Sequence, residues 1–556
     1  MIPLVPHRVV FGFLLLASSC VWPAACSAPA ENSSRPRIFE DLGRWSRPVS
    51  TRSREAQRWF DQGLALTFAF NHDEAIRSYQ EAARLDPSCA MAWWGIAYCH
   101  GPHINNAAMT PEKSAAAWEA VQKAAAASPN ASPVEQALIG ALARRYAADP
   151  AADRAPLDRA YAAAMREAWK AHRRDADVGA LFAESLMDLH PWDLWTHDGE
   201  AKEDTPEIVE TLEAVLAMAP EHPGANHFYI HAVEASPRPE RAVAAADRLT
   251  TLVPGAGHLV HMPAHIYVRV GRFADASRAN EEAMRVDRAY RALSPDQGFY
   301  RVYMAHNPHF LAFSSMMEGR EKAALAAARA LIADIPADLS EADAASMDAF
   351  LPIETQVFLR FGRWEEILRV PEPPPHLPMT AAYRHFARGS ALAALGRGDE
   401  AERELLALRE GTARLADDKI WANNKAKEVL GVGARVLEGE IAAAAGRLED
   451  AARILSEAAV LEDALTYDEP PDWMQPARHT LGAVLLRARL AREAEAVYRQ
   501  DLVRFPENGW SLWGLKRALE MRGAAEEASE VARRFDQAWK RADVKLDTTC
   551  FCLPGI

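Results

Sequence analysis

Four histidines form two pairs with the same internal spacing. His227 and His231 are four residues apart, as are His261 and His265, and the second pair follows the first at an interval of 34 residues. Residues four apart lie on one face of an α-helix, so each pair can direct two imidazoles toward one cation. Imidazole nitrogens are ligands for zinc, copper and iron. The spacing predicts a transition-metal site if the two helices are neighbours.

The elements that must position these histidines follow a repeated pattern. In the segment QRWFDQGLALTFAFNHDEAIRSYQEAARLDPS, the residues Trp59, Gly63, Ala75, Tyr79, Ala82 and Pro87 fall at the positions of the tetratricopeptide repeat. The segment therefore resembles that family. The resemblance implies a pair of antiparallel helices, A and B, in which a small residue of helix A lets helix B approach and a proline ends helix B.

The same positions recur along the chain. A small residue is followed twelve positions later by alanine at Gly63/Ala75, Ala264/Ala276, Ala312/Ala324, Gly389/Ala401, Gly439/Ala451 and Gly482/Ala494, and Ile230/Ala242 fits with a larger first member. Closing prolines follow at Pro87, Pro254, Pro336 and Pro506. The resemblance implies an all-α fold, a right-handed superhelical solenoid of about ten to twelve helix pairs whose A helices line a concave groove. Insertions are expected near 189–205 and 289–303.

The resemblance also implies where the chemistry-bearing side chains point. Positions around the small residue of helix A face the groove, and successive repeats place them side by side, which explains the interval of 34 residues. The metal ligands predicted in this way are His227, His231, His261, His265, His306, His309, Glu184 and Asp188. Glu184 and Glu234 are the candidates for a general base or for a partner that orients an imidazole.

Two functions from different classes follow from this pattern. The first is an exported repeat protein with a histidine-rich metal site, possibly an enzyme, in which zinc, copper and iron fit equally and hydrolysis is not distinguished from oxidation. The second is a protein-interaction scaffold whose groove holds a peptide or an envelope partner. Acidic groove residues that bind basic peptides, histidines that respond to pH, and a duplicated His-x-x-x-His without purpose are the competing explanations.

Other histidines and tryptophans have more local interpretations. His100 and His103, with Cys99 nearby, are candidates for a second metal site or for loop capping, and His72 is expected to be structural. Trp192 and Trp195 belong to the first insertion, which is a candidate lid over the groove or a staple that ties the loop to the solenoid.

The amino-terminal segment resembles a secretion signal. His7 and Arg8 precede an apolar run that is too short to span a membrane, and cleavage after Ala30 would leave a soluble periplasmic or extracellular protein. Lipidation at Cys20 or Cys26 is the rival, but both residues lie in poor lipoboxes. The predicted domains are a signal peptide at 1–30, an extension at 31–54, histidine-bearing repeats at 55–370, a proline-rich break at 371–379, carboxyl-terminal repeats at 380–540 and a tail at 541–556.

Composition and absent motifs exclude several classes. With 63 basic and 77 acidic residues, a net charge of −14 leaves no basic surface for nucleic acid. The sequence contains no P-loop, GxGxxG, HExxH, GxSxG or CxxCH motif, so neither a nucleotide nor haem is expected. Of the cysteines that cleavage would leave, Cys550 and Cys552 are expected to form a disulfide with Cys89 or Cys99, with metal binding or a reduced state as the alternatives.

Overall fold

Helices make up nearly all the regular structure of this chain. The computed structural model describes residues 36–335 and 340–553, so the predicted signal peptide, with Cys20 and Cys26, and the closing proline Pro336 lie outside the described residues. The chain divides into two compact units, the first comprising Met1–Ser236 with Leu293–Tyr300 and the second Pro237–Ala292 with Arg301–Ile556. This division differs from the boundary predicted at the proline-rich stretch 371–379.

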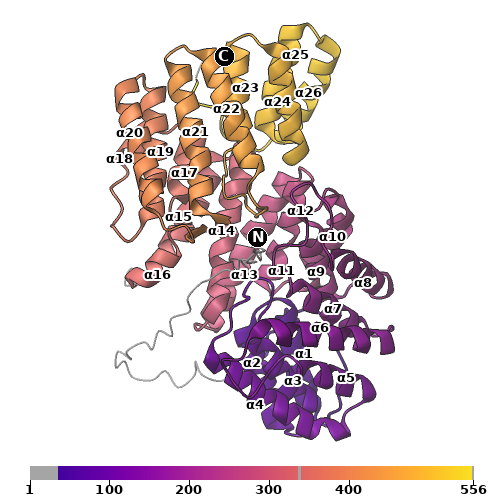
Figure 1. Cartoon of the computed structure of the whole chain (residues 1–556). Helices are drawn as coiled ribbons and strands as arrows, with labels where there is room; N and C mark the ends of the chain where they lie inside the picture. The colour runs from indigo at the N-terminus through magenta and orange to yellow at the C-terminus, as the bar shows by residue number, and fades with distance from the viewer. Residues whose placement is uncertain (1–35, 336–339, 554–556) are drawn as a thin grey trace, which may run out of the picture. The chain divides into compact units, whose positions relative to one another are not determined.

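The first unit contains the amino-terminal helix pairs (Figure 1). Its helices are α1 (Arg54–Phe68), α2 (His72–Leu85), α3 (Ala90–His100), α4 (Pro111–Ala127), α5 (Pro133–Leu142), α6 (Arg154–Ala171), α7 (Ala176–Met187), α8 (Thr205–Met218) and α9 (Pro223–Val233), with short 3-10 turns η1 (Ser128–Asn130) and η3 (Gly298–Tyr300).

The second unit continues the array. It contains η2 (Pro239–Ala242), α10 (Val243–Leu252), α11 (Gly257–His261), α12 (Pro263–Arg269), α13 (Phe273–Leu293), α14 (Arg301–Met317), α15 (Glu321–Ala333), α16 (Glu341–Ser346), α17 (Ile353–Arg360), α18 (Trp364–Arg369), α19 (Pro378–Ala394), α20 (Gly398–Arg414), α21 (Ala426–Ala444), α22 (Leu448–Asp463), α23 (Ala477–Arg487), α24 (Ala491–Arg504), α25 (Gly509–Arg522) and α26 (Ala525–Ala538). Strands β1 (Ile420–Trp421) and β2 (Asn424–Lys425) form a short antiparallel hairpin before α21.

The small positions of the repeat have a direct packing role. The Tyr79 ring of α2 lies between Gly63 of α1 and Gly95 of α3, and a Cβ atom would lie 2.6 Å from the ring at Gly63 and 2.5 Å from it at Gly95. Tyr498 fills the corresponding space between Gly482 and Gly514. Because any side chain would overlap these rings, glycine allows three successive helices to pack together.

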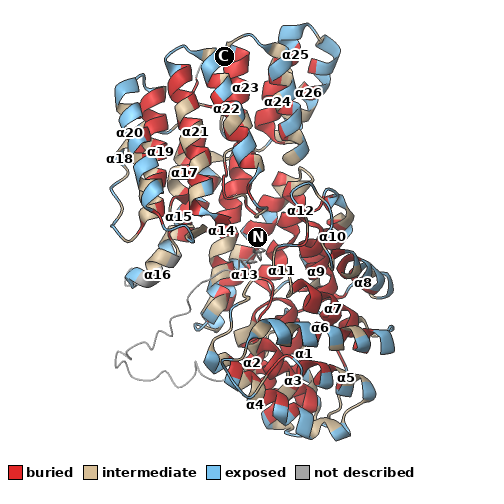
Figure 2. Ribbon diagram, in the orientation of Figure 1, coloured by how far each residue is buried: buried red, intermediate tan, exposed pale blue. Residues whose placement is uncertain are grey.

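The alanines predicted at the helix contacts are all buried. Ala75, Ala242, Ala276, Ala324, Ala401, Ala451 and Ala494 are each 0% exposed. Buried residues gather where the helices face one another, whereas the outward sides of α8, α20 and α26 are exposed (Figure 2). The fold is therefore the all-α array of tetratricopeptide-like helix pairs that the sequence predicts.

The two predicted insertions take different forms. The first is the loop between α7 and α8, in which Trp195 and Ala201 form an isolated bridge. At the second, α13 is prolonged to Leu293. Within the first unit, the following segment 293–300 packs on α2, where the Asp73 carboxylate accepts a hydrogen bond of 3.0 Å from the Phe299 amide.

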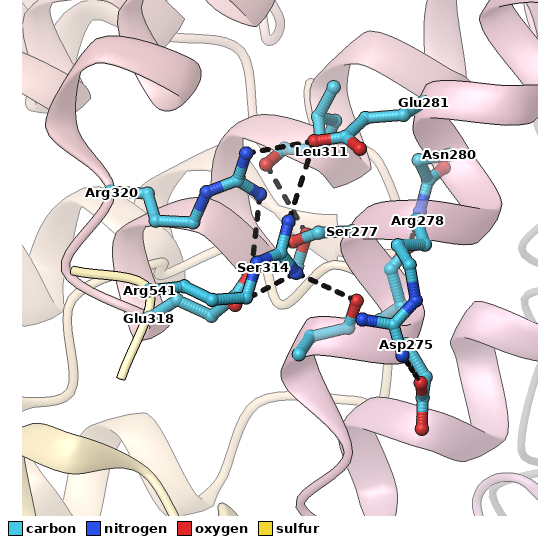
Figure 3. A network of polar contacts seen from close by, with 12 residues as sticks. Asp275, Ser277, Arg278, Asn280, Glu281, Leu311, Ser314, Glu318, Arg320 and Arg541 are labelled. Atoms are coloured by element: carbon cyan, nitrogen blue, oxygen red, sulfur yellow. Dashed lines mark hydrogen bonds and ion pairs between the residues drawn. The ribbon is translucent and has the colours of Figure 1, made fainter. Parts of the chain in front are cut away.

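The carboxyl-terminal end of the second unit packs back on α14 and α15. The Trp510 indole donates a 2.9 Å hydrogen bond to the Met316 carbonyl, and the Asp543 amide donates one of 3.1 Å to the Gly319 carbonyl. Arg541 forms a 3.2 Å ion pair with Glu318 and joins the polar network shown in Figure 3. The last helix pair and the tail thus close on earlier helices of their own unit.

The cysteines differ from the predicted pairing. Cys550 and Cys552 form a disulfide with each other, while Cys89 and Cys99 are free and buried. The expected disulfide between the tail and Cys89 or Cys99 is therefore wrong, because the tail anchors both of its cysteines inside the second unit. Among the residues that the structure describes, no helix combines the length and apolarity needed to cross a membrane.

Candidate metal centre

Three of the predicted histidines come together in the second unit. His261 ends α11, His265 lies in α12 and His306 lies in α14, and one nitrogen of each lies within 4.8 Å of the others. The ring centroids of His261 lie 4.8 Å from those of His265 and 4.7 Å from those of His306. His261 and His265 are buried and His306 is partly exposed. Two successive A helices therefore supply one imidazole cluster.

Prolines interrupt both of these helices. Pro263 separates α11 from α12, and Pro308 lies inside α14. Proline has no amide hydrogen, so it cannot donate to the carbonyl four residues earlier. The His265 amide instead donates to the Met262 carbonyl at 3.2 Å, three residues back. The sequence predicts uninterrupted A helices here, and the structure shows locally tightened segments around the histidines.

Asn280 fixes the tautomer of His261. The Asn280 side-chain nitrogen donates a 2.9 Å hydrogen bond to the Ala276 carbonyl, which leaves its oxygen facing His261 Nδ1 at 2.7 Å. Nδ1 of His261 must therefore carry the hydrogen and donate it, and Nε2 of the neutral ring carries the lone pair. This arrangement, with one ring nitrogen bonded to an oxygen acceptor, is typical of metal-ligating histidines.

The lone pair of His261 faces a second imidazole. His261 Nε2 and His265 Nε2 are 2.8 Å apart. Without a metal, this contact requires His265 Nε2 to carry a hydrogen and donate it to His261. Two protonated rings would repel each other at this distance, so the pair is suited either to a neutral hydrogen bond or to a shared cation.

Phe310 forms an apolar wall beside the three rings. Its centroid lies 5.2 Å from those of His261 and His265 and 5.8 Å from that of His306, and the side chain is fully buried. Burial beside an aromatic ring disfavours charged imidazoles and strengthens electrostatic interactions with an ion. The cluster therefore combines nitrogen ligands with a low-dielectric surround.

The other predicted pair lies on α9 in the first unit. The centroids of His227 and His231 are 4.9 Å apart, His227 Nδ1 lies 2.7 Å from the Phe68 carbonyl, and His231 Nδ1 lies 2.7 Å from the Glu234 carboxylate. Because a carbonyl and an ionised carboxylate only accept hydrogen bonds, both Nδ1 atoms donate. Glu234 thus orients an imidazole, one of the roles expected for it. Convergence of this pair with His261 and His265 remains a prediction.

Glu184 and Asp188 have other partners than the predicted metal. The Tyr98 hydroxyl donates a 2.7 Å hydrogen bond to Glu184, and Asp188 forms an ion pair with the buried Arg145. Burial raises the pKa of Glu184 and raises that of Asp188 well above its usual range. These carboxylates share a buried network in the first unit, and the structure does not place them in a histidine cluster.

His309 also lies apart from the cluster. Its ring packs edge-on against Phe350 with centroids 5.1 Å apart, and burial lowers its pKa to about 3. In the first unit, His103 stacks on Phe70 at 4.4 Å and lies 4.7 Å from His72, and burial lowers the pKa of both imidazoles. These contacts give His309, His72 and His103 a packing role in the described structure.

The first insertion lies against the histidine-bearing helix of the first unit. The Trp195 indole donates a 2.8 Å hydrogen bond to the Ala232 carbonyl of α9, and the Trp192 ring meets His231 edge-on at 5.5 Å. Trp192 also donates to the Asn105 side chain at 3.0 Å and has a positive φ of 60°. The loop is therefore stapled to the repeats and covers one side of His231.

Two residues of the centre escape prediction from the sequence. Asn280 lies on helix B, four residues after the conserved-spacing alanine Ala276, whereas the groove argument considers only helix A. Phe310 follows His306 by one helical turn and is an ordinary core residue in the sequence. The available signal was the position of Asn280 on the face of α13 that turns toward its own helix A.

Comparisons with known proteins add the fold class alone. No family model matches the chain, and no curated protein matches it. The solved structure of the APC/C hetero-tetramer Cut9–Hcn1 aligns with 89% of this chain and 77% of that chain at 12% identity and a TM-score of 0.28.

Two solved structures of human IFIT1 are similarly distant. The dimer with m7Gppp-AAAA covers 88% of this chain and 90% of its own at 13% identity and a TM-score of 0.29, and the dimer with PPP-AAAA covers 88% and 92% at 13% and 0.30. TM-scores this low carry no argument about function. The tetratricopeptide-like character of the chain is seen in its own helix pairs, above all in the glycine contacts of Tyr79 and Tyr498.

Proposed function

We propose that the chain is a tetratricopeptide-like scaffold that holds a divalent transition-metal ion through His261, His265 and His306. The observation that carries this proposal is the gathering of three imidazole nitrogens within 4.8 Å of one another. The hydrogen bond from His261 Nδ1 to Asn280 supports it, since it presents Nε2 as the ligand atom.

The separation of the two buried nitrogens bears on the identity of the metal. An ion at about 2.0–2.1 Å from both atoms, which lie 2.8 Å apart, would subtend an angle of about 85°. This angle is close to that of neighbouring ligands in octahedral or square-planar coordination, which copper and iron accept. Tetrahedral zinc would need a separation of about 3.3 Å, and so a small movement of the rings.

Three protein ligands would leave coordination positions for water or a substrate. Catalytic metal sites commonly have three protein ligands, whereas structural sites are closed by four. His306 is partly exposed, which gives the cluster a side that solvent can reach. We therefore propose a metal-dependent enzyme as the finer function, with hydrolysis and oxidation both compatible with such a site.

We also propose export through residues 1–30, as the positively charged start and the apolar run favour. Amino-terminal sequencing of the mature protein is expected to begin at Glu31. A chain that retains Met1 would contradict this proposal, and a lipid on Cys20 or Cys26, found by mass spectrometry, would replace cleavage with anchoring.

The alternative function is a scaffold for a peptide or protein partner without catalysis. Repeated antiparallel helix pairs support it by themselves, because arrays of this kind present extended concave surfaces. A chain that holds no metal would favour this alternative.

Metal analysis of the purified full chain separates the two functions. We expect mass spectrometry to detect about one equivalent of metal that is lost in His261→Ala and retained in His385→Ala, a control histidine that lies on α19 and bonds Glu404. Added copper, iron or zinc should raise the melting temperature of the parent and the control but not of His261→Ala, because a ligand of the folded state stabilises it. Equal metal content in His261→Ala, or no shift in any variant, would refute the metal proposal.

A further inference from the structure

A second group of metal-ligating side chains lies at the carboxyl-terminal end of the second unit. Cys550 and Cys552 of the tail and Glu440 of α21 place their ligand atoms within 4.8 Å of one another. All three residues are buried, with exposures of 2%, 6% and 4%. The group shares no residue with the histidine cluster, so it does not depend on the function proposed above.

The Glu440 carboxyl lacks the partners that a buried acid normally has. Its Oε2 atom is buried and makes no hydrogen bond among the described residues. Leaving a buried carboxyl oxygen unsatisfied costs free energy, so such a group usually has a partner or a function. Here it lies beside two sulfur atoms, which suggests a ligand that binds oxygen and sulfur together.

The tail is held in place by contacts that do not involve the sulfur atoms. The Thr549 hydroxyl donates a 2.7 Å hydrogen bond to the His479 carbonyl of α23 and lies 2.8 Å from the Tyr498 hydroxyl of α24. The Thr548 hydroxyl donates a 2.8 Å hydrogen bond to the Cys550 carbonyl. These anchors would keep both cysteines beside Glu440 after the disulfide is broken.

We propose that Cys550, Cys552 and Glu440 form a zinc-binding site when the disulfide is reduced. A dithiol reductant breaks the sulfur–sulfur bond by supplying two electrons and two protons, and is itself converted to a disulfide. The divalent ion then replaces the protons of the two thiols and of the Glu440 carboxyl, if that group is protonated. Two thiolates with one carboxylate suit zinc, which accepts sulfur and oxygen ligands together.

The site would make the tail responsive to redox state. In the oxidised chain the sulfur atoms bond each other and cannot act as thiolate ligands. In the reduced chain the ion would take over the link between the tail and α21. The same residues thus offer two alternative connections, one covalent and one through a metal.

Cadmium titration of the full chain tests the site, because cadmium replaces zinc and its thiolate bonds absorb in the ultraviolet. The titration uses His261→Ala, which removes the histidine centre, after reduction with dithiothreitol and its removal without oxygen. We expect one equivalent of cadmium and a thiolate absorption band in the reduced chain, and neither in the oxidised chain. The oxidised chain is a control that needs no further substitution.

Two matched variants assign the carboxylate. Glu440→Gln is expected to weaken cadmium binding by about tenfold or more, as loss of a ligand affects affinity at least as much as loss of an outer partner. Glu438→Gln, on the same helix but salt-bridged to Arg409 at the surface, is expected to bind like the parent. Absence of the band in a reduced chain with two titratable tail thiols, or unchanged affinity in Glu440→Gln, would overturn the proposal.

Discussion

His261 and His479 are both fully buried histidines on A helices of the second unit, but their surroundings differ. His479 Nε2 lies 2.9 Å from the Asp501 carboxylate, and its Nδ1 lies 3.0 Å from the Arg360 guanidinium. A carboxylate that accepts and a guanidinium that donates satisfy both ring nitrogens. His261 instead has an oxygen acceptor on Nδ1 and a second imidazole nitrogen on Nε2.

This difference separates a structural histidine from a ligand-like one. The partners of His479 complement both ring nitrogens of one tautomer, so a metal there would have to displace an existing hydrogen bond. The nitrogen of His261 faces another nitrogen, an arrangement that a shared cation relieves. Burial is the same at both positions, so the chemistry of the partners decides the role.

Removing the structural histidine should have the largest effect. His479→Ala is expected to lower the free energy of unfolding by about 3–5 kcal/mol, because it leaves Asp501 and Arg360 buried without the imidazole between them. Urea unfolding measures this loss, and mass spectrometry should find the metal content unchanged. Loss of the metal from folded His479→Ala would remove the distinction between the two histidines.

A buried acid near His479 should make stability depend on pH. Burial raises the pKa of Glu462 to about 7, while its carboxylate accepts a hydrogen bond from the Ala477 amide. The folded chain therefore holds a proton that the unfolded chain releases near pH 4.5, so stability falls as pH rises from about 4.5 to 7, by about 3 kcal/mol.

Glu462→Gln is expected to lose this fall, since glutamine does not titrate. Thermal unfolding between pH 4.5 and 8 measures the difference between the parent and the variant. Glu457→Gln, on the same helix but partly exposed, is the matched control and should retain the parent profile. Parallel profiles for the parent and Glu462→Gln would contradict the assignment.

The partner of the ligand-like histidine should have a smaller effect. Asn280→Ala is expected to lower metal affinity about 10–100-fold, because it removes the acceptor that orients His261. Asn280→Asp keeps an oxygen acceptor and should restore most of the affinity. Competition with a chromophoric chelator measures both values. Unaltered affinity in Asn280→Ala would mean that Asn280 has only a packing role.

The sequence predicts the repeat well because its contacts are local. A glycine and the ring that fills its space lie within one helix pair, as Gly63 and Tyr79 do, so spacing alone identifies them. The return of the tail to α14 is not predictable in this way. The contact between Asp543 and Gly319 joins residues far apart in the sequence and depends on the curvature that the intervening repeats accumulate.

The candidate centre is predictable in part for the same reason. His261, His265 and His306 follow the phase of helix A, and the structure brings them together. His309 shares that phase but packs on Phe350, which belongs to a later segment. Glu184 and Asp188 have the buried Arg145 as their partner, and an arginine from a connecting loop has no fixed phase in the repeat.

Anomalous diffraction from crystals of the metal-loaded chain tests the central claim most directly, with data collected at the absorption edge of the bound metal. The proposal predicts an anomalous peak about 2.0–2.1 Å from one nitrogen each of His261, His265 and His306. A metal-loaded crystal with no peak at these rings, and with His261 and His265 joined by a hydrogen bond alone, would contradict it.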